Sequence, residues 1–146
     1  MTLNNSLFTS TTEEWETPQA FFDTLNAEFG FVQDVCATPE NAKCQSYFTK
    51  ADNGLERHWR TDGPVFMNPP YGRAIAGWVR KAASEAARGC TVVALLPART
   101  DTRWWHDYCA MADEIRFLRG RLKFGDAKSN APFPSVVVIW RGEATR

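Results

Sequence analysis

The sequence has 146 residues, of which 44% are hydrophobic, 13% aromatic and 23% charged, and its formal net charge is zero. This length and composition predict one domain that buries about two-thirds of its unfolded surface, which excludes a disordered protein. No apolar run approaches the roughly 20 residues of a membrane-spanning helix, so we expect a soluble protein of the cytoplasm. Residues 1–14 and 142–146 are expected to be tails around a domain at residues 15–141.

Basic side chains are concentrated in the second half of the chain. Residues 1–72 hold 4 basic and 10 acidic side chains, whereas residues 73–146 hold 13 basic and 7 acidic ones, so the halves have net charges of −6 and +6. This asymmetry favours a basic face that contacts phosphates, although an internally compensated surface gives the same counts.

No two of the four cysteines form a Cys-x-x-Cys pair, and most lie in or beside apolar runs. They are Cys36, Cys44, Cys90 and Cys109. We interpret them as reduced, small apolar side chains and expect no metal. A zinc site built from Cys36 and Cys44 with His58 or His106 is the less favoured alternative.

The first predicted helix covers residues 18–29, and its inward face carries apolar side chains at helical spacing. Thr17 is expected to be the N-cap and Pro18 the first helical residue, while Gly30 ends the helix. The apolar members of this face are Phe21, Phe22, Leu25 and Phe29.

Two extended segments follow this helix. Residues 31–37 predict a buried strand, in which Asp34 stands out because a carboxylate in an apolar strand costs free energy unless it is paired or used. A second short strand is predicted at residues 44–48, and residues 50–54 have the composition of a turn.

A strand predicted at residues 64–67 leads into the turn Asn-Pro-Pro-Tyr-Gly at 68–72, and a helix at 73–88 follows. The continuous apolar run at residues 90–96 predicts a strand that is covered on both faces. These elements form a strand-turn-helix-strand unit, which places the turn at the carboxyl end of a strand.

The remaining predicted elements are a helix at residues 101–111, capped by Thr100 or Asp101, and two antiparallel strands at residues 114–118 and 135–140. Alternating strands and helices with a closing hairpin predict an α/β fold. We expect a Rossmann-like, mostly parallel sheet with helices on both faces and a C-terminal antiparallel β-hairpin.

Ligands of such sheets bind beyond the carboxyl ends of the strands. Three chemically distinctive segments fall at these ends, namely residues 34–38, 68–71 and 97–101. Their convergence at one edge of the predicted sheet favours an active site over three unrelated connections.

The turn at residues 68–71 is the strongest candidate for chemistry. Two consecutive prolines remove two N–H donors, so the carbonyls of Asn68 and Pro69 are expected to face a ligand, with Tyr71 as an exposed aromatic. The structural alternative is an ordinary strand-to-helix turn in which Tyr71 caps the core. A motif this short does not decide between the two by itself.

Several further segments accompany this turn. The segments that precede it are Trp15-x-Thr17-Pro18, Phe29-Gly30-Phe31-x-x-Asp34-x-Cys36-Ala37, Asn41-Ala42-Lys43, and Asp52-x-Gly54-Leu55 with Trp59. From the turn onward they are Asn68-Pro69-Pro70-Tyr71-Gly72, Leu96-Pro97-Ala98-Arg99-Thr100-Asp101-Thr102 with Trp104-Trp105, and Gly120-Arg121-Leu122-x-Phe124. Over about residues 15–140 the chain therefore resembles the phage-type DNA N-6-adenine methyltransferase family.

The resemblance implies transfer of a methyl group from S-adenosylmethionine to the exocyclic N6 amine of adenine in DNA. Asn68 Oδ1 and the Pro69 carbonyl would accept the two N–H groups of this amine, so that catalysis consists of positioning and electrostatics. Tyr71 would stack on a base flipped out of the duplex, and Pro70 would shape the backbone.

The resemblance also implies a cofactor site. Trp15, Thr17 and Pro18 would border the methionine end of S-adenosylmethionine, and Asp34 would hold its amino group. The other implied contacts are Cys36, Ala37, Asp52 and Asn68. Many such enzymes have a glycine-rich turn after this strand, which this chain lacks, and Asp52 is equally suited to forming a turn before Asn-Gly.

The residues placed to contact DNA follow two later strands. They are Arg99, Thr100, Asp101, Arg103, Arg119, Arg121, Lys123 and Phe133. The cationic members would bind phosphates, and Phe133, which lies between two prolines, would wedge or stack. Helix capping by Thr100 or Asp101 and a solvated basic loop are the structural alternatives.

Three functions remain compatible with these residues. The first is methylation of adenine in DNA, the second is the same chemistry on adenine in RNA or on a protein glutamine amide, and the third is a non-catalytic nucleic-acid-binding module. The chain leaves little room for a separate recognition domain, so loops at residues 38–62 and 119–134 would read the bases. We therefore expect modest sequence specificity or a short DNA site.

Overall fold

The computed structural model describes residues 14–125 and 130–142, and the predicted tails at 1–14 and 142–146 lie almost entirely outside them. Five strands form one sheet in the order β1-β2-β3-β5-β4. They are β1 (Gln33–Asp34), β2 (Val65–Met67), β3 (Val92–Pro97), β4 (Glu114–Phe117) and β5 (Ser135–Trp140).

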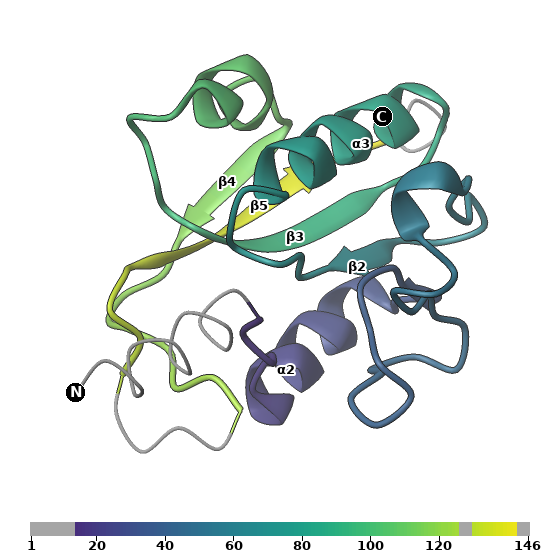
Figure 1. Cartoon of the computed structure of the whole chain (residues 1–146), viewed down its shortest axis with the longest axis horizontal. Coiled ribbons are helices and arrows are strands. Elements are labelled where there is room, and N and C mark those ends of the chain that lie inside the picture. Colours follow the sequence, from purple (N-terminus) through teal and green to yellow (C-terminus); the bar gives the residue numbers. More distant parts are fainter. Residues whose placement is uncertain (1–13, 126–129, 143–146) are drawn as a thin grey trace.

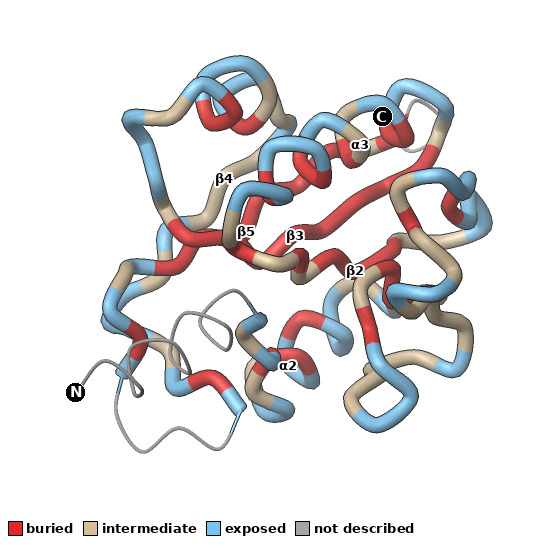
Figure 2. The backbone as a smooth tube through the Cα atoms, in the orientation of Figure 1, coloured by how far each residue is buried: buried red, intermediate tan, exposed pale blue. Residues whose placement is uncertain are grey.

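The sheet is mostly parallel, as predicted. β1, β2 and β3 pair in parallel, whereas β5 pairs antiparallel with both β3 and β4. Of the five described strands, β5 alone therefore runs against the others. Every residue of β3 and β5 is buried, which explains their continuous apolar sequences (Figure 2).

The first strand has 2 residues and is shorter than predicted, and a loop pairs with its outer edge. The backbone N–H of Asp34 donates to Ser46 O and its carbonyl accepts from the Phe48 N–H, both at 3.0 Å. The predicted strand at residues 44–48 is reduced to an isolated bridge between Asp34 and Tyr47. This loop covers the outer edge of β1.

Two α-helices agree with the sequence pattern within one or two residues. α2 (Gln19–Phe29) ends at Gly30, which has a φ of 65°, and α3 (Ile75–Ala87) ends at Arg88. The N-cap of α2 is Pro18 rather than Thr17, and no side chain caps it. Among the described residues, no helix has the length and apolarity needed to cross a bilayer.

The helix predicted at residues 101–111 is wrong in extent. The structure has one π-helical turn, η2 (Trp105–Cys109), and a separate 3-10 turn, η1 (Gly54–Glu56), earlier in the chain. The hydroxyl of Thr102, rather than Thr100 or Asp101, accepts from the backbone N–H of Trp105 at 3.3 Å. Arg103 and Trp104, directly before η2, are α-helical, so the helical segment covers residues 103–109 and only residues 100–102 form a turn.

The helices cover the sheet from different sides. Phe22 of α2 packs against Phe66 of β2 with ring centroids 5.1 Å apart, and α3 contacts β3, β5 and both short helices. Figure 1 shows α3 lying across β3 and β5, with α2 farther from the viewer beside β2.

A buried carboxylate fastens α3 to the loop that carries η1. Glu85 is 2% exposed and accepts from the backbone N–H of Trp59 at 2.6 Å. Arg88 Nη2 and Lys81 Nζ donate to the same carboxylate at 2.8 and 3.2 Å. The sequence pattern gave no sign of this network, because Glu85 occupies a position that a helical wheel assigns to the apolar face.

The strand directions bring five connections to one edge of the sheet. β1, β2, β3 and β4 all run the same way, so their carboxyl ends meet there, and the segment entering β5 meets them because β5 runs the opposite way. The connecting segments are residues 35–43, 68–72, 98–103, 118–125 and 130–134. This edge is where the site is built.

Candidate active site

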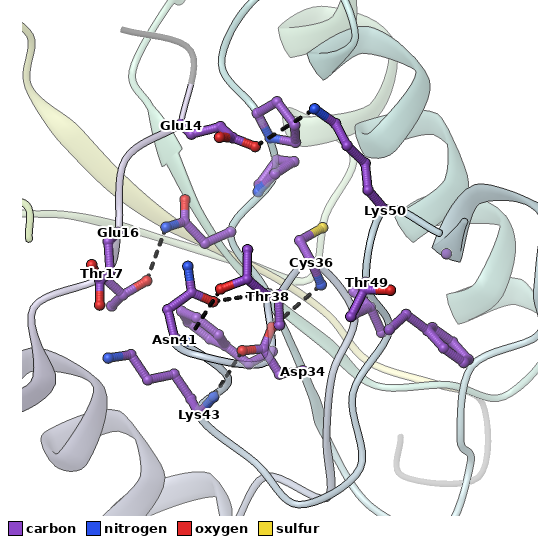
Figure 3. A pocket seen from close by; sticks show the side chains of 18 of the residues that line it. Glu14, Glu16, Thr17, Asp34, Cys36, Thr38, Asn41, Lys43, Thr49 and Lys50 are labelled. Carbon is purple, nitrogen blue, oxygen red and sulfur yellow. Dashed lines mark hydrogen bonds and ion pairs between the residues drawn. The ribbon is translucent and has the colours of Figure 1, made fainter. Parts of the chain in front are cut away.

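A cavity of about 370 Å³ opens at this edge, within the range of roughly 300–1,000 Å³ typical of small-molecule sites. Its walls come from residues within four stretches, 14–17, 34–43, 48–54 and 68–70, and from Phe66 of β2 and Trp78 of α3. Figure 3 shows side chains from the first three stretches converging on it. Both polar and apolar surfaces are present, as a nucleoside carrying an amino acid requires.

Most residues predicted to bind a cofactor line this cavity. They are Trp15, Thr17, Asp34, Cys36, Ala37 and Asn68, with Pro69 and Pro70 of the turn. Pro18 does not line it, because it forms the N-cap of α2. Eight polar side chains that sequence reasoning did not assign also line the cavity: Glu14, Glu16, Thr38, Asn41, Lys43, Thr49, Lys50 and Asn53.

Asp52 lies outside the cavity wall, which corrects its predicted place there. Its Oδ2 accepts from the backbone N–H and hydroxyl of Thr49 at 2.9 and 3.1 Å, so the turn-forming alternative is the observed one. The turn brings Asn53 into the wall with a left-handed φ of 56°. A left-handed non-glycine residue in a cavity wall is a feature of ligand-binding loops.

Asp34 is 3% exposed, and its two carboxylate oxygens accept from the backbone N–H groups of Cys36 at 3.3 Å and Lys43 at 3.0 Å. Burial raises the pKa of Asp34 to about 6, although the N–H groups of Lys43 and Cys36 oppose the shift. This loop lacks glycine, and two of its backbone donors are used within the protein. Its backbone donors face the Asp34 carboxylate, whereas glycine-rich loops turn theirs toward a ligand.

One glycine in the wall is required by close packing. A Cβ on Gly54 would lie 2.8 Å from Val35 O and 3.1 Å from the Trp78 ring. The η1 turn can therefore approach the carboxyl end of β1 only with glycine at this position, and the approach closes the cavity on the side of α3.

The amide of Asn68 is held in one orientation by the N-terminal segment. Its Nδ2 donates to the hydroxyl of Thr17 at 2.9 Å and to the carbonyl of Trp15. Asn68 Oδ1 is buried and has no hydrogen-bond partner among the described residues. The Thr17 hydroxyl therefore binds the Asn68 amide rather than capping α2, and the amide oxygen is left as an acceptor that a ligand can use.

Tyr71 is buried and not exposed, which corrects the prediction. The ring is 2% exposed, and its hydroxyl donates to the Leu95 carbonyl of β3 at 2.9 Å. Its ring contacts Phe124 and Phe133 with centroids 6.2 and 5.5 Å away. A phenol this deep needs a partner for its hydroxyl, and β3 supplies it.

The predicted DNA-contacting residues fall into two groups at this edge of the sheet. The exposed group is Arg99, Thr100, Asp101, Arg103, Arg119, Arg121 and Lys123. Phe133 is instead half-buried and packs on Trp15 and Tyr71 with centroids 5.0 and 5.5 Å away. It is therefore part of an aromatic cluster, and in this structure it is not free to wedge into a duplex.

Arg99 bridges the two neighbouring connections. Its Nη1 donates to the backbone carbonyl of Tyr71 at 2.9 Å, while the Tyr71 hydroxyl bonds to Leu95 within β3. The carboxyl end of β3 thus holds Tyr71 by its backbone and by its side chain. The position of the turn after β2 depends on these two contacts.

A mostly parallel sheet with a carboxylate-lined cavity and an Asn-Pro-Pro-Tyr turn at one edge has the features of the amino-methyltransferases. A model of the family described as DNA N-6-adenine-methyltransferase (Dam) matches residues 5–145. The chain belongs to this family.

Individual relatives agree with the family model. The DNA N-6-adenine-methyltransferase of Escherichia phage T1 is 30% identical over 109 residues, which cover 74% of this chain and 45% of the phage protein. The DNA N-6-adenine-methyltransferase of Haemophilus phage HP1 is 27% identical over 138 residues, covering 89% and 79%. A crystal structure of SMU.472 complexed with SAH matches with a TM-score of 0.43 and 16% identity, covering 67% of this chain and 24% of that one. The chain thus spans less than half the length of the phage T1 protein.

Proposed function

We propose that this chain transfers a methyl group from S-adenosylmethionine to the exocyclic N6 amine of adenine in DNA. The observation that carries the proposal is the buried oxygen of Asn68, an acceptor to which no described residue donates, in a chain of the Dam family. Such an acceptor, fixed by two contacts on the other side of the same amide, suits an N–H group of a planar amine.

The cavity beside Asn68 has a size and a lining that suit S-adenosylmethionine. Its size and its mixed lining accommodate a nucleoside joined to an amino acid, and the Asp34 carboxylate matches the ammonium group of that amino acid. Phe48 and Trp78 offer apolar surface to a nucleobase. When bound, the cofactor supplies an electrophilic methyl group on a sulfonium.

The protein's own part in the reaction is to orient the amine. The lone pair of the N6 amine is delocalised into the purine ring, so the nitrogen is a poor nucleophile. Asn68 Oδ1 and the Pro69 carbonyl would hold its two N–H groups so that the lone pair faces the cavity. Neither oxygen is basic enough to remove a proton beforehand, so the contribution is positioning and electrostatics.

Stacking of Tyr71 on the target base is part of the proposal and requires movement. Tyr71 is covered by Phe124 and Phe133, so a flipped base would have to take the place of at least one of these rings. The exposed cations at this edge, Arg99, Arg103, Arg119, Arg121 and Lys123, would contact the backbone of the DNA.

The acceptor is tested by incubating the protein with radiolabelled S-adenosylmethionine and DNA, RNA or protein, followed by nucleoside analysis of the product. We expect N6-methyladenine in DNA. Methylated RNA or a methylated glutamine would show that the same site acts on another acceptor. DNA binding without any incorporation would overturn the enzymatic assignment.

Binding of S-adenosylmethionine should weaken below pH 6. The pKa of Asp34 is about 6, and only the ionised carboxylate attracts the ammonium group. The dissociation constant, measured by isothermal titration calorimetry, should therefore rise up to about tenfold for each pH unit below 6.

The matched variant for this test is Asp34→Asn, which should bind weakly and without that pH dependence. The folded-state pKa of Asp34 lies above its ordinary value of 3.8, so ionisation opposes folding as pH rises through 6. Asp34→Asn removes this cost, but it also sets an NH2 group against one of the two backbone N–H groups that donate to Asp34. We therefore expect the variant to be less stable at pH 7, and circular dichroism has to show that it is folded before the titration. An unchanged affinity in this variant would remove Asp34 from the cofactor site.

Arg99→Ala should lower kcat by about 10- to 100-fold, because the Tyr71 carbonyl loses its donor and the turn shifts. A residue that contacted phosphate alone would instead raise KM and reduce the salt dependence of DNA binding. Arg103→Ala, on the same exposed loop, is the matched control and should leave kcat unchanged. Steady-state kinetics at several salt concentrations separate these outcomes.

A further inference from the structure

Two polar atoms without a partner lie on adjoining residues of the site. Besides Asn68 Oδ1, the indole Nε1 of Trp15 is buried and makes no hydrogen bond among the described residues. Native proteins leave few buried polar groups unsatisfied, and each such group calls for an explanation. Here one group is an acceptor and the other a donor, and the Trp15 carbonyl is itself bonded to the Asn68 amide.

The contacts of the Trp15 ring place it with the catalytic turn. The indole packs edge-on against Phe124 and Phe133, with centroids 5.5 and 5.0 Å away. The same two phenylalanines contact the ring of Tyr71. Trp15 and Tyr71 therefore belong to one packed aromatic cluster with Phe124 and Phe133, and a base that stacks on Tyr71 in place of one of these phenylalanines would also lie beside Trp15.

We propose that Trp15 Nε1–H reads the target base by donating to N1 of adenine, while Asn68 Oδ1 accepts from the neighbouring N6 amine. This inference rests on the proposed function and names a residue that determines its specificity. It also revises the role that the family resemblance gave Trp15, because the indole would serve the base and not the methionine end of the cofactor.

The donor and acceptor pair makes a chemical selection among bases. Adenine carries an amine beside an unprotonated ring nitrogen on its Watson–Crick edge, and this edge matches Asn68 Oδ1 and Trp15 Nε1–H. Guanine and thymine carry a carbonyl beside a ring N–H, so Asn68 Oδ1 would face an acceptor and Trp15 Nε1–H would face a donor. Cytosine carries an amine beside an unprotonated N3, as adenine does beside N1, so the pair selects the amino bases and does not by itself separate adenine from cytosine. A site built to hydrogen-bond one edge rejects the reversed edge strongly.

The test combines a protein variant with a base analogue. Trp15→Phe keeps a ring in the aromatic cluster and removes the N–H, and 1-deazaadenine at the methylated position removes the acceptor. Each change alone should lower kcat/KM by roughly 10- to 100-fold. Trp15→Phe should show no further loss on the deaza substrate, because both changes remove the same hydrogen bond.

Three results would contradict the proposal. Multiplicative losses from the variant and the analogue would overturn the proposal, since the two groups would then act independently. A weakened affinity of Trp15→Phe for S-adenosylmethionine would assign the N–H to the cofactor and also overturn it. If Trp15→Phe does not fold, the wild type alone decides, because equal rates on adenine and 1-deazaadenine contradict an N1 contact.

The controls separate this inference from the proposed function. Trp104→Phe changes a buried tryptophan outside the cavity and should leave kcat/KM unchanged on both substrates. If the wild type methylates no adenine in DNA, the proposed function fails. If it methylates adenine and 1-deazaadenine equally well, the proposed function stands and the role of Trp15 fails.

Discussion

Asn68→Ala should lower the rate of methyl transfer by at least about 100-fold, the loss typical of removing one preorganised hydrogen-bonding group at a reacting centre. The variant keeps Asp34 and the other cavity walls, so its affinity for S-adenosylmethionine should remain nearly intact. Single-turnover methylation of DNA and calorimetric titration of the cofactor measure the two quantities separately.

The control variant is Asn41→Ala, which removes another amide from the same cavity. Asn41 Oδ1 accepts from the Thr38 N–H at 2.7 Å, so its loss should change the local loop and leave the methyl-transfer step unaffected. Turnover retained in Asn68→Ala would contradict the assignment of the turn as catalytic.

The identity of the amide can be tested as well. Asn68→Asp keeps an oxygen at the open position but turns the donor Nδ2 into a second oxygen. This oxygen would face the carbonyl of Trp15, and the repulsion should displace the N-terminal segment. We expect Asn68→Asp to lose activity and to bind the cofactor more weakly than Asn68→Ala does.

Glu85→Ala should be the most destabilising of the substitutions considered, with a loss of about 2–3 kcal/mol in the free energy of unfolding. The buried N–H of Trp59 would lose its acceptor, and the loop carrying η1 would lose its fastening to α3. Arg88 and Lys81 retain some access to water, which limits the loss. Urea denaturation followed by circular dichroism measures it.

Glu28→Ala is the matched control on the protein surface. Glu28 also accepts two hydrogen bonds from an arginine, Arg116, both at 2.7 Å, but it is exposed. Its removal should cost less than about 1 kcal/mol, as exposed ion pairs do. Equal losses in the two variants would show that burial of Glu85 is not what matters.

The stabilising effect of Glu85 should depend on pH in a defined direction. Burial acts to raise the pKa of Glu85, but hydrogen bonds from Arg88, Trp59, His58 and Lys81 together lower it from 4.5 to about 2. A folded-state pKa below the unfolded one gives stability above pH 4.5 that is lost as pH falls toward 2. Wild type and Glu85→Ala should therefore converge in stability in acid.

Local sequence patterns predicted the helices and strands that depend mainly on the spacing of their own apolar residues. The apolar run at residues 135–140 forms β5, and residues 75–87, with their apolar side chains at helical spacing, form α3. Asp34 was recognised because a carboxylate is costly in an apolar strand, and the structure places it in the cavity wall. The alternation of strands and helices predicted the parallel sheet and the edge at which the cavity lies.

Two of the wrong predictions, for Thr17 and Tyr71, share a physical cause, which is competition from distant partners. Thr17 has the local features of an N-cap, but its hydroxyl bonds to Asn68, which lies 51 residues away. Tyr71 was expected at the surface, yet the Leu95 carbonyl and two phenylalanines bury it. Such pairings depend on how the sheet brings segments together, and no window along the chain contains both partners.

The position of β5 also has a consequence for how the chain acquires its structure during synthesis. β5 is the last described strand in the sequence, yet it lies between β3 and β4 and pairs with both. A growing chain that has emerged only as far as β4 has an unpaired edge on β3 and no neighbour for β4. We therefore expect the second half of the sheet to remain open, and prone to associate with other strands, until residues 135–140 leave the ribosome.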